Sequence, residues 1–129
     1  MKTVLFVCVL NSGRSQMAAA YLNLLAGTKA RGISAGTEPS EQVDPTVIKA
    51  MLEEGVDISQ NKPTLLTPEM MQEADRMINM GCIDAGSCPV HLVPMEDWGM
   101  PDPKGKGLER VRQIRDDIKQ RVIKLIDSL

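Results

Sequence analysis

Cys8, Arg14 and Ser15 are the residues near the start of the chain whose types and spacing suit catalysis. An apolar run at residues 4–7 leads into Cys8, and five residues separate that cysteine from Arg14. A tight loop between a strand and a helix turns several backbone N–H groups toward one point, at the positive end of the helix dipole. Arg14 adds a fork of donors that fits a tetrahedral oxyanion. The stretch therefore predicts a site that holds a dianion directly above a sulfur.

Cys8 is also placed where a thiolate is favoured over a thiol. Helix N-termini and neighbouring cations stabilise the thiolate, which is the nucleophilic form, and Ser15 can donate a further hydrogen bond to the sulfur. The alternative is that Cys8 is a buried strand residue and Arg14 a surface charge. The spacing, with a strand before and a helix after, favours catalysis. We expect seven consecutive residues to bind the oxyanion: Val9, Leu10, Asn11, Ser12, Gly13, Arg14 and Ser15.

Cys82 and Cys88 form a second candidate group, with five residues between them. Such a loop can bring the two Cα atoms within the roughly 4.4–6.8 Å that a disulfide needs. If the strand before Cys82 neighbours the strand before Cys8, three thiols can act in series. A zinc site made from Cys82, Cys88 and His91 is the alternative, but structural zinc normally takes four ligands. We expect no metal, and a structural or surface role for His91.

Asp102 is the third candidate and stands between Pro101 and Pro103, ahead of the last predicted helix. An aspartate held in this way over the edge of a sheet can act as a general acid toward a leaving oxygen. An Asp-Pro pair is usually only a turn, so this motif by itself indicates a turn more than a catalyst.

Predicted strands and helices alternate along the chain. The strands are expected at residues 1–7, 30–35, 75–80 and 90–93. The helices are expected at 15–26 with Ser15 as N-cap, from Asp44-Pro45 to Gly55, at 67–73, and from Leu108 onward with one apolar stripe. This order predicts an α/β fold in three layers, a four-stranded parallel sheet with helices on both faces. Ligands bind beyond the carboxyl ends of such strands, where Cys8 lies.

Length and composition exclude several classes of protein. The chain has 129 residues, enough for a single domain over residues 1–129 and too few for two. A net charge of −2 and three aromatic residues do not suit a nucleic-acid or anionic-membrane partner. The apolar segment near the N-terminus is too short for a secretory signal, and no stretch approaches about 20 apolar residues. Three cysteines argue against a disulfide framework. We expect a cytoplasmic monomer.

Residues 8–15 resemble the C-x5-R-S phosphate loop of the low-molecular-weight protein tyrosine phosphatase fold. Within that fold, the chain most resembles the thioredoxin-coupled arsenate reductases, over nearly its whole length. The matching motifs are Arg14-Ser15-Gln16-Met17-Ala18, Ser34-Ala35-Gly36, the Cys82/Cys88 loop, Glu96-Asp97-Trp98-Gly99, Asp102-Pro103 and Val111-Arg112-x-x-Arg115-Asp116. Phosphatases of this fold typically carry proline where Gln16 stands here. They also tend to carry tyrosines after the aspartate loop, where this chain has residues 104–106, Lys-Gly-Lys.

The resemblance implies that three cysteines reduce arsenate to arsenite. Cys8 attacks arsenate held by the loop and Arg14, while Asp102 protonates the departing oxygen. Cys82 then attacks Cys8 and releases arsenite, and Cys88 attacks Cys82 to leave a Cys82–Cys88 disulfide. Thioredoxin or a similar dithiol would reduce that disulfide, and phosphate or sulfate would compete with arsenate. No metal or organic cofactor is implied.

Two other functions stay open. One is a phosphatase that uses Cys8, Arg14 and Asp102 alone, and the other is a non-catalytic protein whose thiols bind an oxyanion or arsenite. Relatives with a potassium site near the loop usually carry a glutamate and an aspartate at positions held here by Ala19 or Ala20 and by Thr67. We therefore do not expect potassium dependence.

Overall fold

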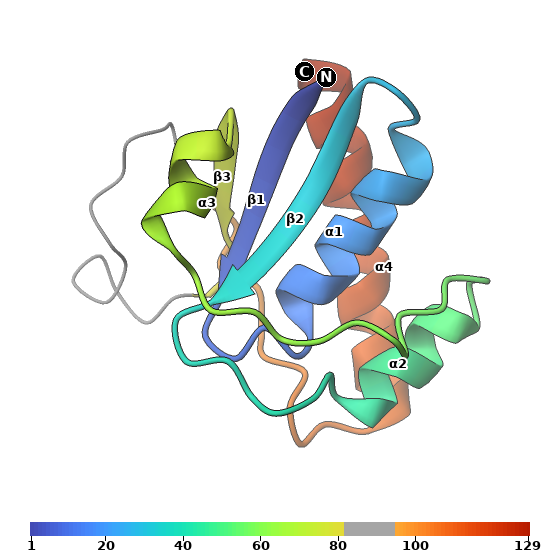
Figure 1. Ribbon diagram of the computed structural model, residues 1–129. Coiled ribbons are helices and arrows are strands. Elements are labelled where there is room, and N and C mark those ends of the chain that lie inside the picture. The colour runs from blue at the N-terminus through green and yellow to red at the C-terminus, as the bar shows by residue number, and fades with distance from the viewer. Residues whose placement is uncertain (82–94) are drawn as a thin grey trace.

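The computed structural model describes residues 1–81 and 95–129, and within them four parallel strands form one sheet (Figure 1). The strands are β1 (Lys2–Cys8), β2 (Ala30–Gly36), β3 (Arg76–Asn79) and β4 (Met95–Asp97). Their order is β2-β1-β3-β4, and every neighbouring pair is parallel. β2 lies on one side of β1 within the sheet, and the chain then crosses to the other side of β1, where β3 and β4 lie. The C-terminal ends of β1 and β3 therefore form the switch point at which such sheets bind ligands.

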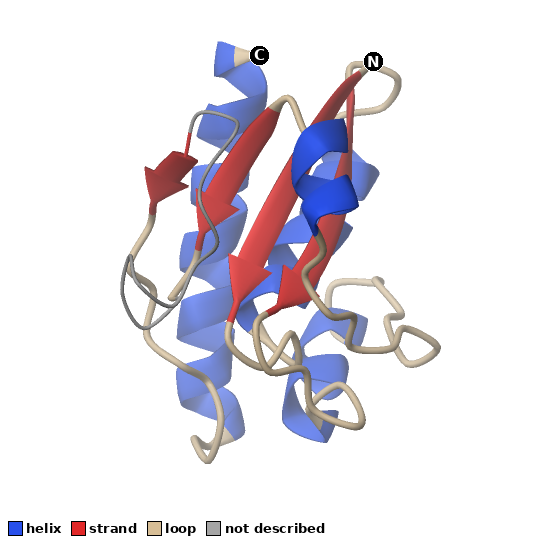
Figure 2. Ribbon diagram, turned by 60° about the vertical axis from the view of Figure 1, so that its left-hand side comes forward, coloured by secondary structure: helices blue, strands red, loops and turns tan. Residues whose placement is uncertain are grey.

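Helices cover both faces of this sheet (Figures 1 and 2). They are α1 (Arg14–Leu25), α2 (Pro45–Leu52), α3 (Pro68–Glu73) and α4 (Leu108–Ser128). α1 and α4 pack together on one face, with α2 against α4, and α3 lies on the other face. The predicted three-layer α/β fold is confirmed.

Burial on both faces explains why β1 reads as an unbroken apolar run. Val4 and Phe6 pack in the larger core with α1 and α4, whereas Leu5 and Val7 face the smaller core under α3. The predicted stripe on the last helix is also confirmed. Its buried members are Val111, Ile114, Ile118, Val122 and Leu125.

Two helices begin as their capping residues predict. Asp44 Oδ1 accepts a hydrogen bond from the Thr46 N–H at 2.9 Å, and Pro45 takes the first position of α2. Thr67 Oγ1 accepts from the Met70 N–H at 3.3 Å at the start of α3. These caps satisfy N–H groups that a helix start otherwise leaves unpaired.

The start of α1 differs from the prediction. Its N-cap is Gly13, not Ser15, and α1 has no side-chain cap. Ser15 lies inside the helix because its hydroxyl is directed to Cys8 instead of to the helix N–H groups. The prediction that Ser15 caps the helix is therefore wrong, because the Ser15 hydroxyl contacts the neighbouring Cys8 sulfur instead.

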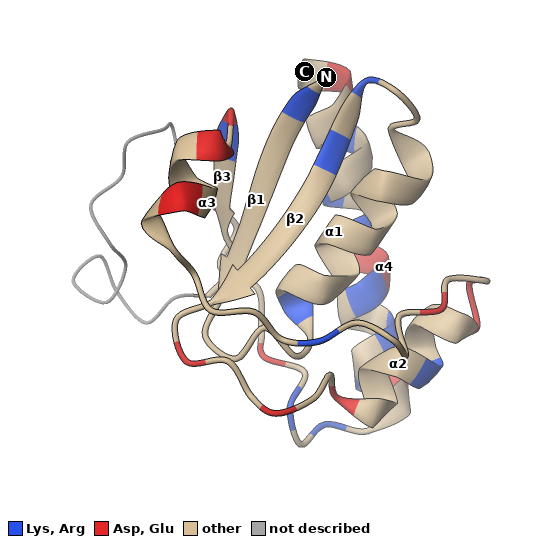
Figure 3. Ribbon diagram, in the orientation of Figure 1, with Lys and Arg blue, Asp and Glu red and all other residues tan. Residues whose placement is uncertain are grey.

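The remaining strand predictions hold in part. The strand expected at 75–80 is present as Arg76–Asn79. The strand expected at 90–93 lies outside the described residues, and β4 follows at Met95–Asp97. Acidic and basic residues intermingle on α4, whereas the one charged residue of α2 is Lys49 (Figure 3). No helix in the described ranges is long and apolar enough to cross a membrane.

Candidate active site

Cys8 is the last residue of β1 and lies at the switch point of the sheet. β1 and β3 pair up to Val7 and Asn79, and the Met80 N–H donates to the Val7 carbonyl at 2.7 Å. The first and third strands are therefore neighbours, which is the condition set above for thiols acting in series. Cys8 itself is buried, with 2% of its surface exposed.

The carbonyl groups of the loop after Cys8 are tied to residues 37–44. Main-chain N–H groups of that segment donate at 2.8–3.2 Å to the carbonyls of Cys8, Val9, Leu10 and Ser12. A trans peptide directs its N–H away from its carbonyl, so the next N–H groups turn to the inner side of the loop. Those N–H groups belong to Val9, Leu10, Asn11 and Gly13. This is the geometry that an oxyanion cradle requires.

A directional series of hydrogen bonds ends on the Cys8 sulfur. The Thr64 N–H donates to Asn11 Oδ1 at 2.8 Å, and this contact fixes the orientation of the Asn11 amide. Asn11 Nδ2 then donates to Ser15 Oγ at 2.6 Å, and Ser15 Oγ lies 2.9 Å from Cys8 Sγ, where its hydroxyl can donate to a thiolate. The Asn11 N–H donates to the same sulfur at 3.2 Å. Two donors therefore face the sulfur, and donors of this kind stabilise a thiolate.

Gln16 belongs to the site, although it was not predicted as a site residue. Its Nε2 donates to the main-chain and side-chain oxygens of Asn11, at 3.1 Å each, and its Oε1 accepts from Asn61 Nδ2 at 3.2 Å. Gln16 is buried on a helix whose neighbouring residues are mostly apolar. A long polar side chain in such a place needs partners, and this was the available signal in the sequence.

Arg14 is buried, with 7% of its surface exposed. Its Nη1 donates to the carbonyl oxygens of Met80 at 3.0 Å and Met100 at 2.9 Å. Its Nη2 lies 3.9 Å from Asp102 Oδ2. The guanidinium thus lies between the end of β3 and the loop ahead of α4, and the alternative of a surface charge is wrong.

Asp102 lies beside the loop with a half-exposed side chain. Its Oδ1 accepts from the Lys104 N–H at 3.0 Å, while Oδ2 faces Arg14. The following Pro103 is packed against Gly13, where an added Cβ would lie 2.7 Å from Pro103 Cγ. The turn expected from the Asp-Pro pair is present, and it brings this carboxylate close to the loop.

The structure thus brings Cys8, Arg14, Ser15 and Asp102 together around one loop. Cys82, Cys88 and His91 lie outside the described residues. The predictions that depend on those three residues, a disulfide or a zinc site, are therefore untested.

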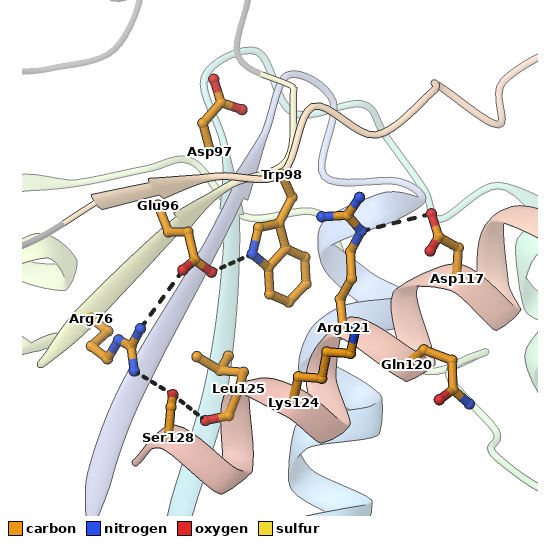
Figure 4. Close-up of a pocket in the computed structure, with 10 residues that line it drawn as sticks. All are labelled: Arg76, Glu96, Asp97, Trp98, Asp117, Gln120, Arg121, Lys124, Leu125 and Ser128. Atoms are coloured by element: carbon orange, nitrogen blue, oxygen red, sulfur yellow. Dashed lines mark hydrogen bonds and ion pairs between the residues drawn. The ribbon is translucent and has the colours of Figure 1, made fainter.

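A large cavity of about 580 Å³ lies between β4 and α4, and none of its lining residues belongs to the site (Figure 4). Two ion pairs lie among its lining residues, since Arg76 lies 3.9 Å from Glu96 and Arg121 lies 3.7 Å from Asp117. A smaller cavity of about 290 Å³ adjoins the loop at Leu10 and extends over residues 40–45. The smaller cavity is therefore the one that adjoins the loop after Cys8.

A buried cysteine and arginine around an amide-lined loop, at the switch point of a parallel sheet, define a class of proteins that handle tetrahedral oxyanions through a thiolate. The family comparison places the chain more narrowly. It belongs to the low molecular weight phosphotyrosine protein phosphatase family, whose model matches residues 3–129.

Among its relatives, the chain is similar to proteins named arsenate reductases. Arsenate reductase 1 of Staphylococcus epidermidis is 40% identical over 121 residues, which cover 92% of this chain and 90% of that protein. A solved arsenate reductase in the phosphate binding state is 38% identical with a TM-score of 0.84, over 99% of this chain and 98% of the other. The thioredoxin-dependent arsenate reductase of Corynebacterium glutamicum is 35% identical with a TM-score of 0.84, and the match spans 99% of this chain but only 61% of that one. The resemblance and the fold class inferred from the sequence are confirmed.

Proposed function

We propose that the chain is an arsenate reductase with Cys8 as its nucleophile. The observation that carries this proposal is the buried Cys8 sulfur, which accepts from the Asn11 N–H and lies 2.9 Å from the Ser15 hydroxyl, beneath an amide-lined loop. The 40% identity to a protein named arsenate reductase supports the choice of substrate. A similar structure in a phosphate binding state supports an oxyanion in the loop. Phosphate and sulfate share the tetrahedral shape of arsenate and should compete with it.

In the first step, the Cys8 thiolate attacks arsenic and forms a sulfur–arsenic bond. The loop N–H groups and Arg14 hold the arsenate oxygens, and preorganised donors of this kind stabilise the charge that develops on them. Asp102 supplies the proton with which one oxygen leaves as water. Arsenic remains As(V) at this stage.

Reduction takes place when a second thiol attacks the first. The Cys82 thiolate attacks the Cys8 sulfur, a disulfide forms, and the sulfur–arsenic bond breaks with its electron pair retained by arsenic, which leaves as arsenite. Cys88 then attacks Cys82, which releases Cys8 as a thiolate and leaves a Cys82–Cys88 disulfide. The pairing of β1 with β3 supports this order, because Cys82 follows soon after β3 in the sequence.

An external dithiol must reduce the final disulfide before another arsenate can react. We take this dithiol to be thioredoxin, because a similar protein is described as thioredoxin-dependent. The relay needs a reducing compartment such as the cytoplasm, and it uses no metal or organic cofactor.

Arsenate turnover by three cysteine variants tests the relay. We expect Cys8→Ser, Cys82→Ser and Cys88→Ser each to abolish repeated turnover, measured as NADPH oxidised through thioredoxin reductase and thioredoxin. After a single turnover, mass mapping should find a Cys82–Cys88 disulfide in the wild type and a Cys8–Cys82 disulfide in Cys88→Ser. Repeated turnover by Cys88→Ser would disprove the three-thiol relay.

A phosphatase is the second candidate, because the family description names that activity and the first attack is chemically the same. It would use Cys8, Arg14 and Asp102 alone. Intact hydrolysis of an aryl phosphate by Cys82→Ser, together with no arsenate turnover by the wild type, would favour it. Stoichiometric arsenite binding without any turnover would instead favour a non-catalytic binding protein.

A further inference from the structure

Gly81, which directly precedes Cys82 in the sequence, lies against the guanidinium group of Arg14. A Cβ atom built on Gly81 would lie 2.7 Å from Arg14 Cζ and closer still to Nη1. The φ angle of Gly81 is 141°, a conformation that other residues rarely adopt. Its N–H donates to Asn79 Oδ1 at 3.0 Å, which holds the glycine in place. Arg14 thus occupies the position that a side chain would take.

This space allows Arg14 Nη1 to reach the carbonyls of Met80 and Met100. Nη1 carries two hydrogens, and these two carbonyls account for both of them. The edge of the guanidinium that remains for an oxyanion is formed by Nε and Nη2, and Nη2 is also the atom that faces Asp102. The two carbonyls therefore set the direction in which Arg14 presents its bidentate edge.

We propose that Gly81 is a positioning residue for oxyanion binding, because its missing side chain lets Arg14 lie on the Met80 and Met100 carbonyls with its Nε/Nη2 edge toward the loop. The inference rests on the proposed role of Arg14 in oxyanion binding, and it does not depend on the cysteine relay. Among the glycines of the described ranges, Gly81 is the one whose added Cβ would meet Arg14.

A side chain at position 81 would displace Arg14 more readily than the backbone, since the guanidinium is the far end of a flexible side chain. The displaced arginine would lose the fixed direction of its fork, on which bidentate recognition depends. We therefore expect weaker oxyanion binding by a protein that still folds.

Protection of Cys8 by phosphate measures this effect. The full chain carrying Cys82→Ser and Cys88→Ser retains Cys8 as its single cysteine, so the rate of alkylation by iodoacetamide reports on that thiol. We expect Gly81→Ala to raise the phosphate concentration for half-protection at least tenfold. Gly55→Ala is the matched control, because Gly55 has a φ of 76° and nothing lies within 4 Å of its added Cβ. The control should stay within twofold, and the two variants should unfold at similar temperatures.

An Arg14→Lys background separates positioning from backbone strain. Lysine has no fork to direct, so Gly81→Ala should weaken phosphate binding less than twofold further in that background. An equal loss in both backgrounds, or no loss in the Arg14 background, would overturn the inference. Absence of phosphate protection in the reference protein, which carries Cys82→Ser and Cys88→Ser but keeps Gly81 and Arg14, would overturn the oxyanion site and this inference together. Normal protection with the predicted effects, but no arsenate turnover by the wild type, would remove only the proposed function.

Discussion

Asn11 adopts a backbone conformation that few residues tolerate, at the centre of the loop around Cys8. Its φ of 51° is the one positive value among the non-glycine residues of the described ranges, and asparagine is among the few residue types that accept it. The side chain is fully buried, and it accepts from Thr64 and Gln16 while it donates to Ser15. A buried amide with all of these partners in place favours a single loop shape. Asn11 therefore links the shape of the loop to the hydroxyl that contacts the sulfur.

Replacement of Ser15 by alanine tests this link. Ser15→Ala removes the hydroxyl that lies 2.9 Å from Cys8 Sγ and can donate to its thiolate, and hydrogen bonds to charged groups contribute about 1.5–3 kcal/mol. We expect the rate of Cys8 alkylation by iodoacetamide at pH 7 to fall roughly tenfold or more, since the thiolate is the reactive form. Ser40→Ala is the control, because the Ser40 hydroxyl contacts the Gln42 carbonyl instead. An unchanged alkylation rate in Ser15→Ala would show that the hydroxyl does not stabilise the thiolate.

At the scale of elements, the end of β2 packs against the loop that follows Cys8. An added Cβ at Gly36 would lie 2.5 Å from the Val9 carbonyl oxygen and 2.9 Å from the Asn11 nitrogen. This contact requires a residue without a side chain at the last position of β2. The segment that follows β2, residues 37–44, then holds the loop carbonyls and leads into α2. The strand and the helix that flank this segment thus fix the loop after Cys8 through the main chain.

α2 and α4 are joined by a cluster of ion pairs around Glu53. Arg112 Nε donates to Glu53 Oε1 at 2.9 Å, and Arg115 Nη1 donates to the same oxygen at 3.0 Å. Hydrogen bonding from Arg112, assisted by Arg115, lowers the pKa of Glu53 from its ordinary 4.5 to about 2. The folded protein therefore favours the carboxylate more strongly than the unfolded chain does.

This lowered pKa predicts how stability depends on pH. The Glu53 carboxylate contributes stability above about pH 4.5, and this contribution is lost as the pH falls from about 4.5 toward 2. Glu53→Gln should therefore be less stable than the wild type at pH 7, and the difference should shrink over that window. Urea unfolding at pH 7, 4 and 2.5 measures it, with Glu41→Gln in an exposed loop as the control. A difference that stays constant with pH would contradict the assignment.

At the scale of the whole molecule, periodicity and order along the chain were sufficient to predict the three layers. The continuous apolar run of β1 and the stripe on α4 each have a local pattern, and both are present. The C-x5-R spacing likewise predicted the loop, because a strand, a loop and a helix start are adjacent in sequence. Local patterns of this kind can be recognised from the sequence because the residues that form them are close together along the chain.

The features that the sequence did not predict depend on contacts between distant residues. Arg14 meets carbonyls 66 and 86 residues away, and Gln16 meets Asn61, 45 residues away. Partners at this distance become known only once the strand order is fixed. The wrong N-cap at Ser15 has a different cause: a serine at a predicted helix start usually caps it, but the Ser15 hydroxyl contacts Cys8, only seven residues away.

Oxyanion binding should stabilise the entire chain, because the loop is tied to residues 37–44, to Thr64 and, through Arg14, to Met80 and Met100. A ligand at 100 times its dissociation constant stabilises the folded state by about 2.7 kcal/mol, which for a chain of this size corresponds to a rise in Tm on the order of 10 °C. We expect phosphate to produce this shift in the wild type, measured by differential scanning calorimetry against chloride at equal ionic strength. Arg14→Gln should lose most of it. An equal shift in that variant would mean that phosphate acts as a general stabilising salt and not through the loop.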